Sequence, residues 1–135
     1  MFKNKPPLAD GQSIDTLIGP QVTLHGDLVF SGGLYVEGRV HGRIVAEEGT
    51  KAVLIVAEQG RSEGEVQVPV VVINGELHGD VHASERVELT PSARVNGNVH
   101  YQVVEMNAGA QLNGRLLHSA AMAALPAPQA EAEQA

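Results

Sequence analysis

The chain has 135 residues, a length that fits one domain with its own core, and its formal charge of −7 argues against nucleic acid as a direct partner. It has no cysteine, so no disulfide framework is expected and a reducing compartment suits it. Aromatic residues make up only 3%, whereas there are 15 glycines and 7 prolines, which predicts a core of Val, Ile and Leu joined by frequent tight turns.

Residues 1–15 are polar, contain Pro6 and Pro7 and show no periodicity, which predicts a flexible N-terminal arm. This arm lacks the apolar stretch of a secretory signal, and no segment reaches the roughly 20 apolar residues that a membrane helix needs. We therefore expect a cytoplasmic protein.

Residues 16–117 carry a repeat in which an apolar residue, any residue, a glycine, any residue and a second apolar residue follow one another. It occurs six times, centred on Gly26, Gly42, Gly64, Gly79, Gly97 and Gly114. The third copy is degenerate because it begins with Ser62. Successive glycines lie 16, 22, 15, 18 and 17 residues apart. A repeat near 17 residues with alternating apolar positions predicts an all-β solenoid in which each repeat forms one winding.

Each winding is long enough for three short strands, which predicts about six triangular windings stacked as parallel strands. The segments Val36–Ile44 and Ile73–Val81 run from glycine to glycine in four residues and form a second, tighter class of winding. The longest repeat contains Glu47–Lys51, which is predicted to bulge from a corner as a loop. After the repeat, residues 118–135 are rich in Ala and Pro and predict a disordered tail.

Histidines recur at fixed places in the repeat. His25, His41 and His78 share the position before the glycine, which Glu63, Asn96 and Asn113 fill in the other windings. His82 and His100 each follow a motif glycine by three residues, so they are expected to stack one winding apart. Two imidazoles could bind a divalent metal, but no third ligand is apparent, and we interpret these positions as an outward ladder of polar side chains. Amide ladders are expected at Asn74, Asn96, Asn98 and Asn113.

Catalytic and nucleotide-binding motifs are missing from the sequence: there is no P-loop, no G-x-S-x-G and no G-x-G-x-x-G. The acidic pairs Glu47–Glu48 and Glu63/Glu65 have no partner that would raise a pKa, so they are interpreted as surface charges. We expect no enzyme activity, no cofactor, no metal and no nucleotide.

A solenoid has two open ends, which must be capped or must meet a neighbour. The arm is too polar and the tail too rich in small residues to serve as lids, so the end windings are the predicted polymer interface. The residues of this interface are Val22, Leu24, Leu28, Phe30, Leu112, Leu116 and Leu117. The alternative is that they only complete the cores of their own windings.

The repeated segments of the Val36–Ile44 type, with a short arm before them and a Pro-containing tail after them, resemble the bactofilins, bacterial cytoskeletal proteins that polymerise without nucleotide. The resemblance implies a right-handed triangular β-helix that assembles head to head and tail to tail into non-directional filaments. It also implies filaments on the inner face of the cytoplasmic membrane that recruit cell-envelope or polarity factors. Met1, Phe2, Lys3 and Lys5 look like the membrane-targeting peptide of that family.

An enzyme on a left-handed β-helix is the alternative. Hexapeptide-repeat acyltransferases and γ-type carbonic anhydrases also stack triangular windings and place active sites between three subunits. Their strict six-residue repeat is not matched by glycine spacings that range from 15 to 22 residues.

Overall fold

The computed structural model describes residues 15–118, which form three parallel sheets of six strands each and contain no helix. Sheet A comprises β1 (Thr16–Ile18), β4 (Gly33–Val36), β7 (Val53–Val56), β10 (Val70–Ile73), β13 (Arg86–Leu89) and β16 (Val103–Met106). Sheet B comprises β2 (Thr23–His25), β5 (Arg39–His41), β8 (Arg61–Glu63), β11 (Glu76–His78), β14 (Arg94–Asn96) and β17 (Gln111–Asn113). Sheet C comprises β3 (Leu28–Phe30), β6 (Ile44–Ala46), β9 (Val66–Gln67), β12 (Val81–His82), β15 (Val99–Tyr101) and β18 (Leu116–His118).

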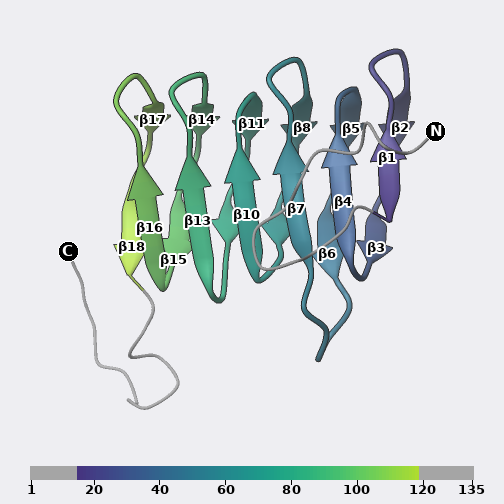
Figure 1. Cartoon of the computed structure of the whole chain (residues 1–135), viewed down its shortest axis with the longest axis horizontal. Coiled ribbons are helices and arrows are strands. Elements are labelled where there is room, and N and C mark those ends of the chain that lie inside the picture. The colour runs from purple at the N-terminus through teal and green to yellow at the C-terminus, as the bar shows by residue number, and fades with distance from the viewer. Residues whose placement is uncertain (1–14, 119–135) are drawn as a thin grey trace.

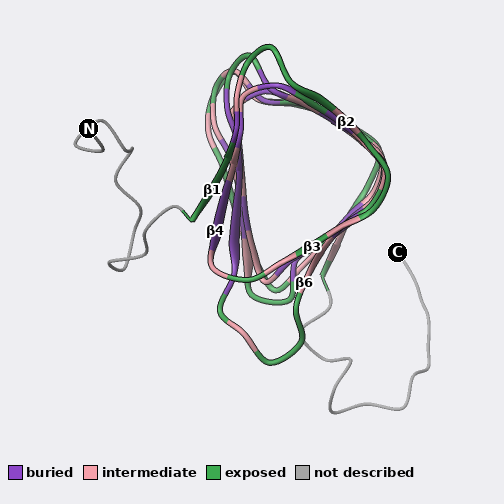
Figure 2. Ribbon diagram, turned by 90° about the vertical axis from the view of Figure 1, so that its right-hand side faces the viewer, coloured by how far each residue is buried: buried purple, intermediate pink, exposed green. Residues whose placement is uncertain are grey.

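Three consecutive strands make one winding, and every strand pairs in parallel with the strand three places along the chain. The windings follow one another in chain order along the long axis of the molecule (Figure 1). Viewed along that axis, the three sheets form the sides of a triangle (Figure 2). The predicted all-β solenoid of about six windings is therefore confirmed.

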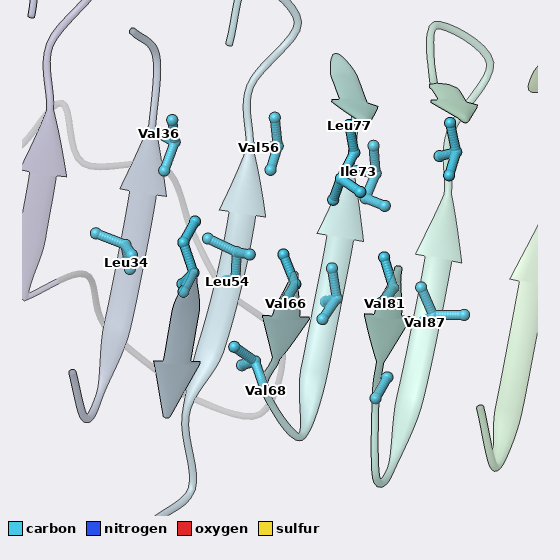
Figure 3. Close-up of a cluster of buried hydrophobic side chains, with 14 of the residues drawn as sticks. Leu34, Val36, Leu54, Val56, Val66, Val68, Ile73, Leu77, Val81 and Val87 are labelled. Carbon is cyan, nitrogen blue, oxygen red and sulfur yellow. The ribbon is translucent and has the colours of Figure 1, made fainter. Parts of the chain in front are cut away.

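The interior consists of ladders of aliphatic side chains, one rung from each winding. In sheet C, one inward ladder contains Leu28, Ile44, Val66, Val81, Val99 and Leu116 in register, and its four middle members are completely buried. Figure 3 shows the same arrangement for Leu34, Leu54 and Val87 of sheet A, which lie together with their neighbours in the core. Full burial of each such side chain contributes about 1.5–3 kcal/mol, so the core needs no large aromatic residue.

Ser62 interrupts the inward ladder of sheet B. It lies in register between Val40 and Leu77, is completely buried, and its Oγ has no hydrogen-bond partner. A buried hydroxyl without a partner costs about 1–3 kcal/mol relative to an apolar group of the same shape. The degenerate third repeat is therefore a weak rung in an otherwise aliphatic ladder.

The repeated glycines occupy the corners between sheets B and C, where successive windings come closest. Gly42 has a φ of +151°, which L side chains rarely adopt. A Cβ at Gly42 would also collide with the carbonyl oxygen of Gly26 in the preceding winding. Both the backbone conformation and the stacking distance therefore require glycine at this corner.

The corners between sheets A and B come in two lengths, as the sequence predicted. In the third winding the chain turns through Ala57–Gly60, with the Gly60 amide donating to the Ala57 carbonyl at 2.8 Å. The fourth winding has only Asn74 and Gly75 between β10 and β11. Gly75 fits there because its missing side chain leaves room for the carbonyl groups of the longer corner above it.

The insertion after β6 forms a loop that bulges from the corner between sheets C and A, which confirms the interpretation of Glu47–Lys51 (Figure 2). Thr50 closes the loop because its amide and its Oγ1 both donate to the Glu47 carbonyl, at 3.3 and 2.6 Å. Gly49 supplies the positive φ of +78° that the turn requires. The insertion thus leaves the ladders of the neighbouring windings in register.

Candidate polymer interface at the ends of the solenoid

Within residues 15–118, the first and last windings each have one edge without a strand partner. Strands β1, β2 and β3 stand at one end of their sheets and β16, β17 and β18 at the other, so each pairs with a single neighbour. An edge strand carries backbone donors and acceptors that another chain can meet. Each end of the solenoid therefore presents three short open edges around an apolar interior.

Large exposed hydrophobic side chains are confined to these two windings within residues 15–118. The first winding contributes Leu17, Val22 and Val29, which are 58%, 46% and 66% exposed. The last winding contributes Val103, Met106 and Leu116, which are 55%, 44% and 38% exposed. The four middle windings contribute none among the described residues. Exposed apolar surface of this kind is typical of an interaction site.

The predicted interface residues lie at both ends, but in different environments. Leu24, Leu28, Phe30 and Leu112 are half-buried and pack against the core as the outermost rungs of its ladders. Leu116 ends the ladder of sheet C and is more exposed than they are. Val22 lies at the corner before β2, where its carbonyl accepts a hydrogen bond from the Arg39 amide at 3.0 Å. Phe30 is part of β3 and so belongs to the first winding.

Leu117 faces away from the core. It is in register with His100, which belongs to the outward ladder of sheet C. Leu116 and Leu117 thus point to opposite sides of β18, as adjacent residues of a strand must. Of the two, only Leu116 belongs to the open end of the core.

Sequence reasoning missed four of the exposed hydrophobic residues: Leu17, Val29, Val103 and Met106. Met106 is in register with the buried Leu89, so the alignment of repeats could have identified it as the last rung of a core ladder. Leu17, Val29 and Val103 are paired with Tyr35, Val45 and Arg86 on outer faces. The period-2 pattern identifies the inward core positions, but it does not show whether an apolar residue on the outward face will be exposed.

The residues before the motif glycines form one continuous ladder on the outside of sheet B, as predicted. The His25 and His41 rings stack with their centroids 4.9 Å apart, and His41 Nδ1 lies 3.0 Å from Glu63 Oε1. At the other end of the ladder, Asn113 Nδ2 donates to Asn96 Oδ1 at 3.0 Å. The predicted amide ladder therefore exists at these two asparagines, whereas Asn98 accepts a hydrogen bond from the Arg115 amide instead.

Sheet C carries the second predicted stack. The rings of His82 and His100 lie parallel to within 10°, with their centroids 4.4 Å apart. His82 Nε2 is 3.1 Å from Glu65 Oε2 in the winding before it. The prediction that these two histidines stack one winding apart is confirmed.

Glu63, the acidic residue of the sheet B ladder, contacts both Arg61 and His41. The hydrogen bond from Arg61 Nε, at 2.8 Å, lowers the pKa of Glu63 most, and contacts with His41 lower it further. Arg61 also reaches Glu76 through Nη1 at 2.9 Å. These contacts link three windings on an exposed face, where solvent screens the charges.

Residues 15–118 contain no group of three or more His, Asp or Glu side chains placed to hold a metal ion. In the same part of the chain there is no helix long and apolar enough to cross a membrane. The predicted membrane contacts Met1, Phe2, Lys3 and Lys5, and the tail after His118, lie outside the described residues.

Comparison with known proteins identifies the family of this β-helix. The family model of the bactofilins, described as polymer-forming cytoskeletal, matches residues 16–117. The chain belongs to the bactofilin family. Its β-helix is thus that of a polymer-forming cytoskeletal protein, which favours the scaffold interpretation over the enzyme alternative.

Two curated bactofilins of Myxococcus xanthus (strain DK1622) are similar to this bactofilin. BacP is 31% identical over 110 residues, which cover 81% of this chain but only 44% of BacP. BacO is 28% identical over 102 residues, which cover 76% of this chain and 78% of BacO. The chain therefore spans less than half the length of BacP. No solved structure gives a significant match.

Proposed function

We propose that this bactofilin is a non-catalytic scaffold that assembles end to end into filaments without nucleotide. The observation that carries the proposal is the confinement of large exposed hydrophobic residues to the first and last windings of the described chain. Contact between two ends would bury these residues and complete the outermost rungs of the core. It would also give the open strand edges a partner, which is the role of strand addition in many assemblies.

In the non-directional arrangement that the resemblance implies, like ends meet. A first winding then contacts the first winding of one neighbour, and a last winding contacts the last winding of the other. Each contact would be isologous, so the same side chains serve on both sides of it. The filament would therefore alternate between two different junctions, which can be broken separately.

Leu28→Arg and Leu116→Arg form a matched pair for this test, because both residues lie in one inward ladder of sheet C, at opposite ends. An arginine in an apolar junction leaves a buried charge without a partner, so each variant should break one junction. Negative-stain electron microscopy should show filaments of the wild type and none of either variant. Light scattering should give each variant about twice the 14.2 kDa mass of the chain, because the intact end still pairs.

Gln67→Arg is the matched control, since Gln67 is an exposed outward residue of β9 in the middle of the solenoid. It introduces the same charge away from both ends and should leave filaments intact. Monomers in place of dimers in the two end variants would show that unlike ends meet. Filaments that persist in both variants would refute assembly through the ends. Circular dichroism should confirm that each variant remains folded.

We also propose that residues 1–5 bring the filament to the inner face of the cytoplasmic membrane. Phe2 supplies an apolar side chain, and Lys3 and Lys5 supply charges that anionic lipids attract. One such contact is weak, but a filament multiplies it. Filaments should co-sediment with vesicles that contain phosphatidylserine, and Phe2→Glu should abolish this. Equal binding of the Leu116→Arg variant and the filament would argue against the role of multiplicity.

We propose finally that the filament recruits cell-envelope or polarity factors, as the resemblance to the bactofilins implies. A filament repeats each outer face at a regular interval, so a weakly binding partner gains avidity along it. A partner obtained with wild-type filaments should therefore be lost with Leu116→Arg.

A further inference from the structure

Two stacked histidine pairs bridge neighbouring windings, and each ends on a glutamate of the third winding. His25 and His41 join the first winding to the second, and Glu63 lies beside His41. His82 and His100 join the fourth winding to the fifth, and Glu65 lies beside His82. Glu63 and Glu65 flank the motif glycine Gly64, so the two arrangements extend from one corner toward opposite ends of the solenoid.

We propose that these two histidine stacks make the solenoid pH-sensitive, so that acidification loosens the first winding from the second and the fourth from the fifth. A neutral imidazole stacks on its neighbour without electrostatic cost. When both rings of a pair carry a proton, two positive charges face each other across 4.4 or 4.9 Å between ring centroids. Histidine titrates between about pH 5 and 8, so this change falls in a range that cells experience.

In each stack, one of the two rings lies within ion-pair distance of a carboxylate. In the first stack, Glu63 lies beside His41 but also accepts a hydrogen bond from Arg61, and Arg39 adds a second cation on β5. In the second stack, Glu65 lies beside His82. Asp80 lies two residues before His82, on the same winding as His82. Glu47 and Glu48 of the insertion loop line the same groove as His82. Beyond His100, the next residue of the outward ladder is the uncharged Leu117.

Burial lowers the pKa of His100 below its ordinary value of 6.5, and the charge of His82 lowers it further. Asp80 and Glu65 oppose this shift without reversing it. A histidine with a lowered pKa in the folded state contributes stability in full above pH 6.5, the unfolded value, and loses it as the pH falls through the folded value. The sign therefore agrees with loosening by acid.

At the other end of sheet B, asparagines occupy the ladder position that His25 and His41 occupy in the first two windings. They provide an internal comparison, because their side chains do not ionise. Asn96 and Asn113 are joined by a neutral amide hydrogen bond of 3.0 Å. Neither amide group titrates, so the side-chain contact between the fifth and sixth windings on this face should not respond to pH. The consequence for filaments, namely weaker contacts at the first winding in acid, rests on the proposed function, whereas the loosening itself does not.

Thermal unfolding of the full chain at about pH 7.5 and about pH 5.5 tests the proposal. The wild type should unfold at a temperature lower by about 4 °C or more at the lower pH, the shift expected for the loss of one moderate interaction. His100→Gln and His25→Gln should each reduce this difference, because one ring of each stack can no longer charge. His78→Gln is the matched control: His78 shares the ladder position of His41 but is hydrogen-bonded to Asn96 rather than stacked on a histidine.

The control variant should keep the full difference between the two pH values. A wild type whose unfolding temperature does not change, or stack variants that keep the wild-type difference, would overturn the proposal. Proton NMR of the histidine rings in the full-length Leu116→Arg chain gives a second measurement that does not depend on stack variants folding. His100 is expected to have a pKa below the ordinary histidine value, and a pKa of His100 at or above that value would contradict the proposal.

Discussion

The middle windings and the end windings place mostly aliphatic side chains at the same inward ladder positions, yet they differ in what those side chains contact. Leu77 and Leu112 both occupy the inward ladder of sheet B. Leu77 is completely buried because a winding lies on each side of it, whereas Leu112 is half-buried because only one does. In a solenoid, the burial of a residue is therefore set by the number of stacked neighbours as much as by the residue itself.

The repeated glycine shows the same contrast. A Cβ on Gly79 would collide with the carbonyl oxygen of Gly64 in the preceding winding, whereas a Cβ on Gly26 would meet no atom within 4 Å. Both have positive φ, of +142° and +125°. The conformational requirement for glycine is thus common to both. The steric requirement arises only where a winding precedes the glycine, so it is missing in the first winding and present in the last, at Gly114.

The largest effect is expected from substituting the motif glycine in the middle of the solenoid. Gly79→Ala should destabilise the fold by about 4 kcal/mol, because the left-handed backbone strain and the forced separation of two windings add. Gly26→Ala should cost about 2 kcal/mol, from the strain alone. Chemical unfolding at equal protein concentration measures both. Equal losses would show that backbone conformation, and not stacking, dictates the glycine.

A smaller effect is expected from shortening matched leucines in one ladder. Leu77→Ala should cost about 3 kcal/mol because it leaves a cavity between two windings, and Leu112→Ala about 1 kcal/mol because its site is already half open. Filament assembly should show the reverse order, with the Leu112 variant more impaired at temperatures where both are folded. If Leu112→Ala leaves assembly intact, the end of this ladder is not part of the junction.

The smallest effect is expected at the weak rung of the same ladder. Ser62→Val should raise stability by about 1 kcal/mol, since it replaces a buried hydroxyl without a partner by the side chain that Val40 and Val95 provide elsewhere. Ser62→Ala removes the hydroxyl without adding volume and guards against overpacking. Thermal unfolding of both compares the two contributions. A loss of stability in both variants would mean that the hydroxyl is hydrogen-bonded in solution.

Much of the fold could be predicted because the repeat fixes the register. Once the motif glycines are aligned, His82 falls beside His100 and Asn96 beside Asn113, and the structure confirms both pairs. Parallel stacking places equivalent residues one above another, so sequence alignment within the chain is also a map of contacts between windings. The aliphatic core followed from the same alignment.

The candidate interface could be predicted only in part. Leu24, Leu28, Leu112 and Leu116 could be placed at the ends of the core because they occupy core positions in the first and last repeats. Exposed outward residues such as Leu17 and Val29 were missed, since nothing in the alternation separates them from covered ones. Leu117 was also predicted as an interface residue; it lies on the outward side of β18, and its contact with a neighbour stays a prediction.

The sequence by itself determined the solenoid: period-2 apolar positions and a glycine in every repeat allow few arrangements other than stacked, three-sided windings. Tertiary structure alone decided which side chains remain exposed and which polar side chains meet, such as His41 with Glu63 and His82 with Glu65. The physical reason is that burial and pairing depend on the number and identity of the windings stacked against a residue. That information lies in neighbours about one repeat away and in the absence of a neighbour at each end.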